Sequence, residues 1–166
     1  MKSTLTLFAL FAATAFFAAG CGKSKEDLDA EKTANAEVMK MHDDAMALIK
    51  KMDDADTQLA MYLLQHDSLV AAKPAQMSEH NADDISKARG RISTAKMSME
   101  SWMKAHHPYS ENMKHDEAVK KLAADKEDLT NAIANMEGAL KAAADAGDNH
   151  MKLMTQMMPK GKKGKK

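Results

Sequence analysis

The sequence contains little of what disulfide-bonded, zinc-binding or turn-rich proteins need. Its 166 residues include one cysteine, three prolines and seven glycines. A single cysteine excludes an intrachain disulfide and a zinc site built from cysteine pairs. The scarcity of glycine and proline argues against an all-β fold, because such folds need many turns, and it favours long uninterrupted helices.

An excess of charge of one sign and known catalytic motifs are also lacking. The chain carries 24 basic and 24 acidic side chains, which gives no overall case for binding nucleic acid. The sequence has no HExxH motif, no GxSxG motif and no glycine-rich phosphate loop. We therefore expect a protein that is not an enzyme and that binds no specific nucleic acid.

Residues 1–20 have the features of a secretory signal peptide. Lys2 precedes an apolar run at positions 5–19, which is too short for a typical membrane span. The segment AAGC at positions 18–21 resembles the lipobox of bacterial lipoproteins, with alanine where leucine is usual. In that family the cysteine becomes the lipidated first residue, so the resemblance implies a lipid on Cys21. The alternative is an ordinary cleavage site followed by an unmodified cysteine.

The lipoprotein resemblance also implies a location. Gly22 follows the cysteine in place of aspartate, which in such lipoproteins favours the outer membrane. The segment KED at positions 25–27 is similar to an acidic tag for surface display. We therefore expect a cell-envelope protein, periplasmic or surface-facing, that several acyl chains on Cys21 hold firmly on the membrane.

Apolar and small side chains recur every three or four residues in three stretches of the chain. This spacing is typical of a helix with one buried stripe, on a seam like that of a coiled coil. The three stripes comprise Val38, Met41, Ala45, Leu48, Met52, Ala55, Leu59, Tyr62 and His66; Ile85, Ala88, Ile92, Ala95, Met99, Trp102 and His106; and Val119, Leu122, Leu129, Ile133, Met136, Leu140 and Ala143.

The predicted fold class is therefore all-α, an elongated antiparallel three-helix bundle. A connector spans residues 67–77, Pro108 ends the second helix and Gly147 ends the third. Helices of about 30 residues that pack up, down and up give a rod roughly 45 Å long. The predicted organisation is a signal peptide at 1–20, a polar tether at 21–35, the bundle at 36–147 and a disordered Met/Lys-rich tail at 148–166.

Two short segments are similar to a group of small helical bacterial lipoproteins. They are MKMHDDAM at positions 39–46 and MESWM at positions 99–103, and the resemblance covers residues 36–143. The group often carries the misleading name viral A-type inclusion protein, and it has no established activity. Its members tend to have glutamate at the position of Asp44. The resemblance implies a helical, lipid-anchored protein and implies no site residues.

Methionine is abundant, with 16 residues, and it occurs in groups that each have a histidine nearby. Thioether sulfur is a soft ligand that suits Cu(I), and imidazole suits copper in general. His42 and Met46 lie four residues apart, as do Met99 and Met103, so each pair shares a helix face. The candidate ligands of a soft metal are Met39, His42, Met46, Met99, Met103, His106, His115, His150, Met151, Met154, Met157 and Met158.

An antiparallel register predicts where part of this set lies. If the first turn joins residues near 67 and 79, the numbers of facing positions on the first two helices sum to about 146. Trp102 then lies near position 44 and Met99 near position 47, so methionine, histidine and tryptophan gather at the end nearest Cys21. The alternative is that the methionines fill the core and the histidines are solvated.

These patterns favour two functions. The first is a lipid-anchored helical protein of the cell envelope with a non-catalytic binding or structural role. The alternative is a soft-metal lipoprotein that binds copper or silver, with Cu(I) as the one cofactor considered. Besides the membrane, the expected partner is a protein or anionic polymer that contacts the basic end of an otherwise acidic chain. The lysines of that end are Lys160, Lys162, Lys163, Lys165 and Lys166.

Overall fold

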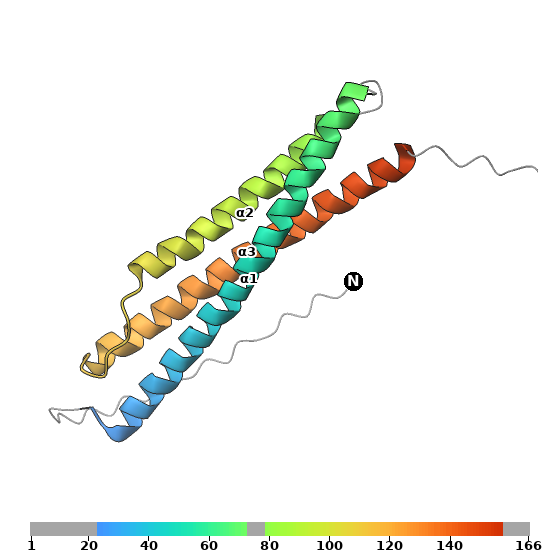
Figure 1. Cartoon of the computed structure of the whole chain (residues 1–166). Coiled ribbons are helices and arrows are strands. Elements are labelled where there is room, and N and C mark those ends of the chain that lie inside the picture. Colours follow the sequence, from blue (N-terminus) through green and yellow to red (C-terminus); the bar gives the residue numbers. More distant parts are fainter. Residues whose placement is uncertain (1–22, 73–78, 158–166) are drawn as a thin grey trace, which may run out of the picture.

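The computed structural model describes residues 23–72 and 79–157. Nearly all of them belong to three helices, α1 (Lys25–Ala72), α2 (Glu79–Ala105) and α3 (His115–Met157), as Figure 1 shows. No strand occurs within these two ranges, so the prediction of an all-α three-helix bundle is confirmed. Cys21, Met158 and the five lysines of the basic end lie outside the described residues.

Contacts between the helices establish their directions. From the beginning to the end of α1, the contacting residues on α2 have decreasing numbers. The contacting residues on α3 have increasing numbers. α2 therefore runs back along α1, and α3 runs back along α2 (Figure 1). The contacts concerned are Asp53 with Lys96, Asp56 with Arg89, Glu37 with Lys126, and Gln65 with His150.

The buried side chains follow a heptad pattern. On α1 they recur every seven residues from Glu31 to His66, and on α2 and α3 they alternate spacings of three and four. Side chains at this spacing interdigitate as in a left-handed coiled coil. The core is formed by Val38, Ala45, Met52, Leu59, Ile85, Ala88, Ile92, Ala95, Met99, Trp102, Leu122, Leu129, Met136, Ala139, Ala143 and Ala146.

On α3 the buried stripe lies one residue earlier than predicted at three positions. Ala118, Ala132 and Ala139 are buried there. Val119, by contrast, is 49% exposed, and Ile133 lies only at the edge of the core. Alanine at the seam lets helix backbones approach closely, so the larger neighbouring side chains are displaced to the margin.

α1 begins earlier than predicted, and the expected tether over 21–35 is wrong from Lys25 onward. The amide N–H of Asp27 donates to Ser24 Oγ at 3.0 Å, and the amide N–H of Ser24 donates to Asp27 Oδ2 at 3.1 Å. This reciprocal pair is a capping box, which satisfies backbone donors that the first turn leaves open. Glu31, one heptad before Val38, continues the buried stripe into this segment.

Two other helix ends also lie beyond their predicted positions. α1 continues to Ala72, so the helix includes the first residues of the expected connector. α3 continues through Gly147 to Met157, so residues 148–157 are helical and the prediction of a disordered tail is wrong for them. The helix continues because His150 remains on the buried face. With 48 residues, α1 is about 70 Å long, which exceeds the predicted rod length.

Candidate functional site

Three rings meet near the end of the rod at which α1 begins. The Trp102 ring centroid lies 4.5 Å from that of His106, with the ring planes 23° apart. It lies 5.7 Å from the ring of His42, which comes from α1, with an angle of 32°. The predicted register placed Trp102 opposite position 44, so the observed contact with His42 confirms it to within one helical turn.

The end of α2 positions His106 in this group. α2 ends at Ala105, but the amide N–H of His106 still donates to the Trp102 carbonyl at 2.7 Å. The two rings are therefore four residues apart on one continuous helical turn and face the same side. Pro108 follows and prevents the residue before it from continuing the helix.

A pocket of about 300 Å³ opens beside these rings between α1 and the end of α2. Its lining contains two thioethers and two imidazoles, and the thioethers are accessible, since Met39 is 42% and Met103 40% exposed. The lining residues are Asn35, Met39, His42, Trp102, Met103, His106, Pro108 and Tyr109. Four of the predicted metal ligands therefore share one pocket.

Each imidazole of the pocket has one nitrogen beside a carboxylate. His42 Nδ1 lies 3.3 Å from Asp43 Oδ1, and His106 Nδ1 lies 3.3 Å from Asp125 Oδ2 on α3. The second pair is within ion-pair distance, but its angles do not make a hydrogen bond. Asp125 also forms an ion pair with Lys121, so its carboxylate is held in place. A carboxylate beside Nδ1 favours the tautomer that leaves Nε2 able to bind a metal.

Trp102 is held by packing. Its ring belongs to the core, and its indole Nε1 is buried with no hydrogen-bond acceptor among the described residues. The rings of His42 and His106 contact it. A tryptophan face attracts cations more strongly than the faces of other aromatic rings. The pocket therefore combines soft donors with a surface that favours positive charge.

The other predicted ligands lie outside this pocket. Met46 is exposed but is absent from the lining, and Met99 is fully buried in the core. His115 at the start of α3 binds a buried carboxylate, described below. Further along α3, Met151 is exposed and Met154 and Met157 are half-buried at the far end of the rod. The predicted gathering of methionine, histidine and tryptophan at this end is thus reduced to four candidate ligands around Trp102, drawn from α1 and the end of α2.

A buried carboxylate at the beginning of the rod was not predicted from the sequence. Glu31 is 1% exposed and accepts hydrogen bonds from Lys23 Nζ at 2.6 Å, Tyr109 OH at 2.7 Å and His115 Nδ1 at 2.8 Å. Burial would raise its pKa, but the three hydrogen bonds outweigh burial and lower the pKa to about 2. Burial and the bond to Glu31 raise the pKa of Tyr109 to about 12.

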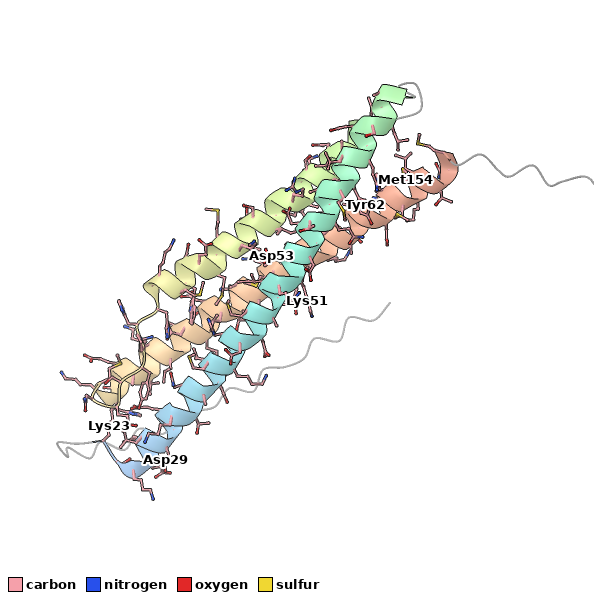
Figure 2. All side chains as sticks on the ribbon, in the orientation of Figure 1. Lys23, Asp29, Lys51, Asp53, Tyr62 and Met154 are labelled. Carbon is pink, nitrogen blue, oxygen red and sulfur yellow. The ribbon has the colours of Figure 1, made fainter. Side chains whose placement is uncertain are left out.

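This network joins the chain before α1, the connection between α2 and α3, and the beginning of α3. Extending the first apolar stripe backward by one heptad from Val38 would have located Glu31. Because every partner of the carboxylate is a donor on a different segment, the arrangement closes this end of the bundle. Lys23 lies at this end, whereas Tyr62 and Met154 lie towards the opposite end (Figure 2).

His150 lies in the core near that opposite end. Its ring stacks on Tyr62 at a centroid distance of 4.5 Å, and its Nε2 lies 3.3 Å from Gln65 Oε1. Burial and then the charge of His66 lower the pKa of His150. The side chain was predicted as a metal ligand of the tail, but it is a packed seam residue of α3.

Within residues 23–72 and 79–157, no group of three or more His, Cys, Asp or Glu side chains is arranged to hold a metal ion. None of the three helices combines the length and apolar character needed to cross a bilayer. Comparisons of the chain with protein-family models, with curated proteins and with solved structures found no significant match.

Proposed function

We propose that this protein is a lipid-anchored, non-catalytic binding component of the cell envelope. The observation that carries the proposal is the beginning of α1. The capping box starts at Ser24, three residues after the cysteine of the lipobox-like segment. A chain lipidated at Cys21 therefore presents a rigid helix almost directly from the membrane surface, with its network around Glu31 closest to the lipid.

The pocket beside Trp102 lies near the same end. Lys23 and Met39 are separated by 16 residues of mostly helical chain, which corresponds to roughly 24 Å. A lipid on Cys21 would thus hold the pocket within a few tens of ångströms of the membrane surface. A binding site placed there encounters ligands and partners of the envelope.

The carboxylate network around Glu31 is not itself a candidate for catalysis. A pKa of about 2 keeps Glu31 ionised at neutral pH, and three donors already occupy its oxygens. A general acid or base needs a pKa near the working pH and a free position for the substrate. Glu31 meets neither condition, so its role is structural.

Metabolic labelling tests the anchor. In a bacterial host that processes lipoproteins, we expect the wild-type chain to incorporate an alkyne-labelled fatty acid and to have a mature N-terminus at lipidated Cys21. The Cys21→Ala variant should incorporate none, whereas the matched variant Ser24→Ala should label like the wild type. A mature wild-type protein whose Cys21 carries no lipid would overturn the proposal.

The basic end gives a further proposed contact. Asp and Glu outnumber Lys and Arg between residues 21 and 146, whereas lysine dominates residues 147–166. α3 ends at Met157, three residues before the first lysine of the basic end, and its last turns around Met154 lie towards the end of the rod opposite Lys23 (Figure 2). We propose that Lys160, Lys162, Lys163, Lys165 and Lys166 contact an acidic protein or anionic polymer there.

Crosslinking in intact cells, with the wild-type chain and with a chain lacking residues 159–166, tests this contact. We expect one crosslinked neighbour to disappear when the lysines are removed. An unchanged set of crosslinked products would contradict a contact made by the basic end.

A second candidate function is soft-metal binding. The observation that favours it is the shared pocket of Met39, His42, Met103 and His106. Met46, Met99, His115 and His150 no longer support it, because each lies outside that pocket. The candidate therefore depends on four residues and on Trp102.

A further inference from the structure

We propose that the pocket beside Trp102 binds one soft monovalent cation, Cu(I) or Ag(I), through the thioethers of Met39 and Met103 and the imidazoles of His42 and His106. The proposal rests on the second candidate function and gives it a defined site. It is independent of the lipid on Cys21.

The positions of the four donors along the chain support this assignment. Met39 and His42 are three residues apart on α1, and Met103 and His106 are three residues apart at the end of α2. Residues at this spacing lie next to each other on a helix surface. Since His42 contacts the Trp102 ring across the interface, the two pairs face the same pocket. The antiparallel packing of α1 and α2 thus brings two sulfur–nitrogen pairs together.

Packing does not account for the two methionines. Met52, Met99 and Met136 are fully buried and fill the core, as methionine usually does. Met39 and Met103 have about two fifths of their surface exposed and border a pocket. Their sulfur atoms are on flexible side chains that an entering ion can recruit.

The chemistry of the lining selects for a soft ion. Sulfur and nitrogen donors line the pocket together with Asn35, Pro108 and Tyr109, and its lining includes no carboxylate. Thioethers prefer Cu(I) and similar ions, whereas Mg²⁺ and Ca²⁺ need several oxygen ligands. Asp43 and Asp125 lie behind the imidazoles, where they orient the rings and partly offset the added positive charge.

Trp102 contributes to the site and reports on it. His106 stacks on the indole ring at a centroid distance of 4.5 Å and the His42 ring lies 5.7 Å from it, so an ion held by these imidazoles lies close to the ring. Trp102 is the single tryptophan of the chain, so tryptophan fluorescence reports on ions bound beside this ring. Binding at Met61 or Met151, which are exposed but border no pocket beside Trp102, would leave that signal nearly unchanged.

A titration with Ag(I), a redox-inert substitute for Cu(I), tests the proposal. The protein is the chain from residue 21 to residue 166 with Cys21→Ala, which removes the one thiol, in a chloride-free buffer. We expect saturable quenching of Trp102 fluorescence at one equivalent of Ag(I). Met39→Leu and Met103→Leu keep the side-chain volume but remove the sulfur, and each should weaken binding about tenfold or more.

Matched variants separate a site from general methionine affinity. Met61→Leu on α1 and Met151→Leu on α3 change exposed methionines that border no pocket beside Trp102, and both should bind like the parent. His42→Gln should also weaken binding, and circular dichroism verifies that each variant is folded. Mg²⁺ should cause no quenching.

Absence of saturable quenching would overturn the proposal, as would equal binding by the parent, Met39→Leu and Met103→Leu. An equal loss in Met61→Leu would also contradict it, because it would show that the methionines act without a defined site. Because the titrated chain carries no lipid, a negative result leaves the membrane anchor unaffected. Likewise, a failure of fatty-acid labelling would not alter the titration.

Discussion

At the residue scale, the polar side chains on the buried seam distinguish this bundle from a simple apolar one. Glu31 occupies a seam position near the beginning of α1, and His66 and His150 occupy seam positions near the other end. A buried polar group stabilises a fold only when its partners are in place, and removing a partner is costly. The stability of each end of the rod therefore depends on the protonation of one buried side chain, Glu31 at the beginning of α1 and His150 at the other end.

Glu31 predicts a loss of stability in acid. Its pKa is about 2 in the folded protein and near 4.5 in the unfolded chain. Between these values the unfolded chain binds more protons, so the stabilisation is complete above pH 4.5 and is lost as the pH falls towards 2. Thermal unfolding of the wild type between pH 6 and pH 3 should show this loss.

The variant Glu31→Gln should flatten that dependence. At pH 7 it weakens the charge-assisted bonds from Lys23, Tyr109 and His115, at a cost of about 1–3 kcal/mol. Glu37→Gln removes an exposed carboxylate of the same helix and should retain most of the wild-type acid slope. If Glu31→Gln has the wild-type slope, Glu31 is not the group responsible.

His150 predicts a second pH dependence at higher pH. Burial and the charge of His66 lower its pKa below the ordinary value of 6.5. The unfolded chain therefore takes up the proton first, and stability falls as the pH drops below about 6.5. Melting temperatures of His150→Leu should change less between pH 7 and pH 5 than those of the wild type. His107→Gln, which alters an exposed histidine, serves as the control and should behave like the wild type.

At the element scale, two helices each contain a glycine that weakens the helix without providing a needed backbone conformation. Gly90 in α2 and Gly138 in α3 are exposed, and neither has a positive φ. A Cβ atom built on either residue meets no atom within 4 Å, so alanine fits without a clash. Alanine restricts the unfolded chain and favours helix, which is worth about 0.5–1 kcal/mol at each position.

Urea unfolding of Gly90→Ala and Gly138→Ala should therefore show higher midpoints with unchanged slopes. Gly147→Ala provides a comparison. Its Cβ would lie 3.4 Å from Tyr62 Cε2, so this substitution should raise the urea midpoint less. A lower midpoint in either of the first two variants would mean that the groove between α2 and α3, which both glycines line, needs the missing side chains.

The elements were predictable where apolar side chains alone define the seam. The first two stripes are recovered because Val38, Leu59, Ile85 and Ile92 are large and regularly spaced. On α3 the seam is mostly alanine, and alanine also occurs on exposed faces, so the larger Val119 was preferred wrongly. Composition does not show which of two adjacent small residues faces a neighbour.

The helix ends were mispredicted for a related reason. Glu31 and His150 are polar, so their seam positions were not recognised as continuations of the stripe. A glycine ends a helix when it adopts a left-handed conformation, but the φ of Gly147 is negative and the helix continues through it. Tertiary contacts with Tyr62 and Gln65 outweigh the local preference of this segment to stop.

The candidate site was partly predictable. The antiparallel register correctly brought His42 near Trp102, because it depends only on the length of the connection. Spacing could not separate Met103, which lines the pocket, from Met99, which is buried one turn earlier on the seam. That distinction depends on the rotation of α2 against its neighbours, which the packing of all three helices determines.

At the scale of the whole molecule, the three helices differ in length, and this shapes the two ends. α2 has 27 residues, whereas α1 has 48 and α3 has 43. α2 therefore stops short of the beginning of α1, and the connection after Pro108 covers the remaining part with Tyr109 bound to Glu31 (Figure 1). The pocket beside Trp102 lies where this change from helix to connection occurs.

The unbroken course of α1 from Lys25 to Ala72 has a mechanical consequence. A continuous helix that packs against α3 along most of its length and against α2 over part of it resists bending, so its two tips stay at a constant separation. With a fatty acyl group on Cys21, the opposite tip would stand about 70 Å above the headgroups when the rod is upright. The molecule would then behave as a stiff spacer, and whatever binds its outer tip would be kept at that height from the bilayer.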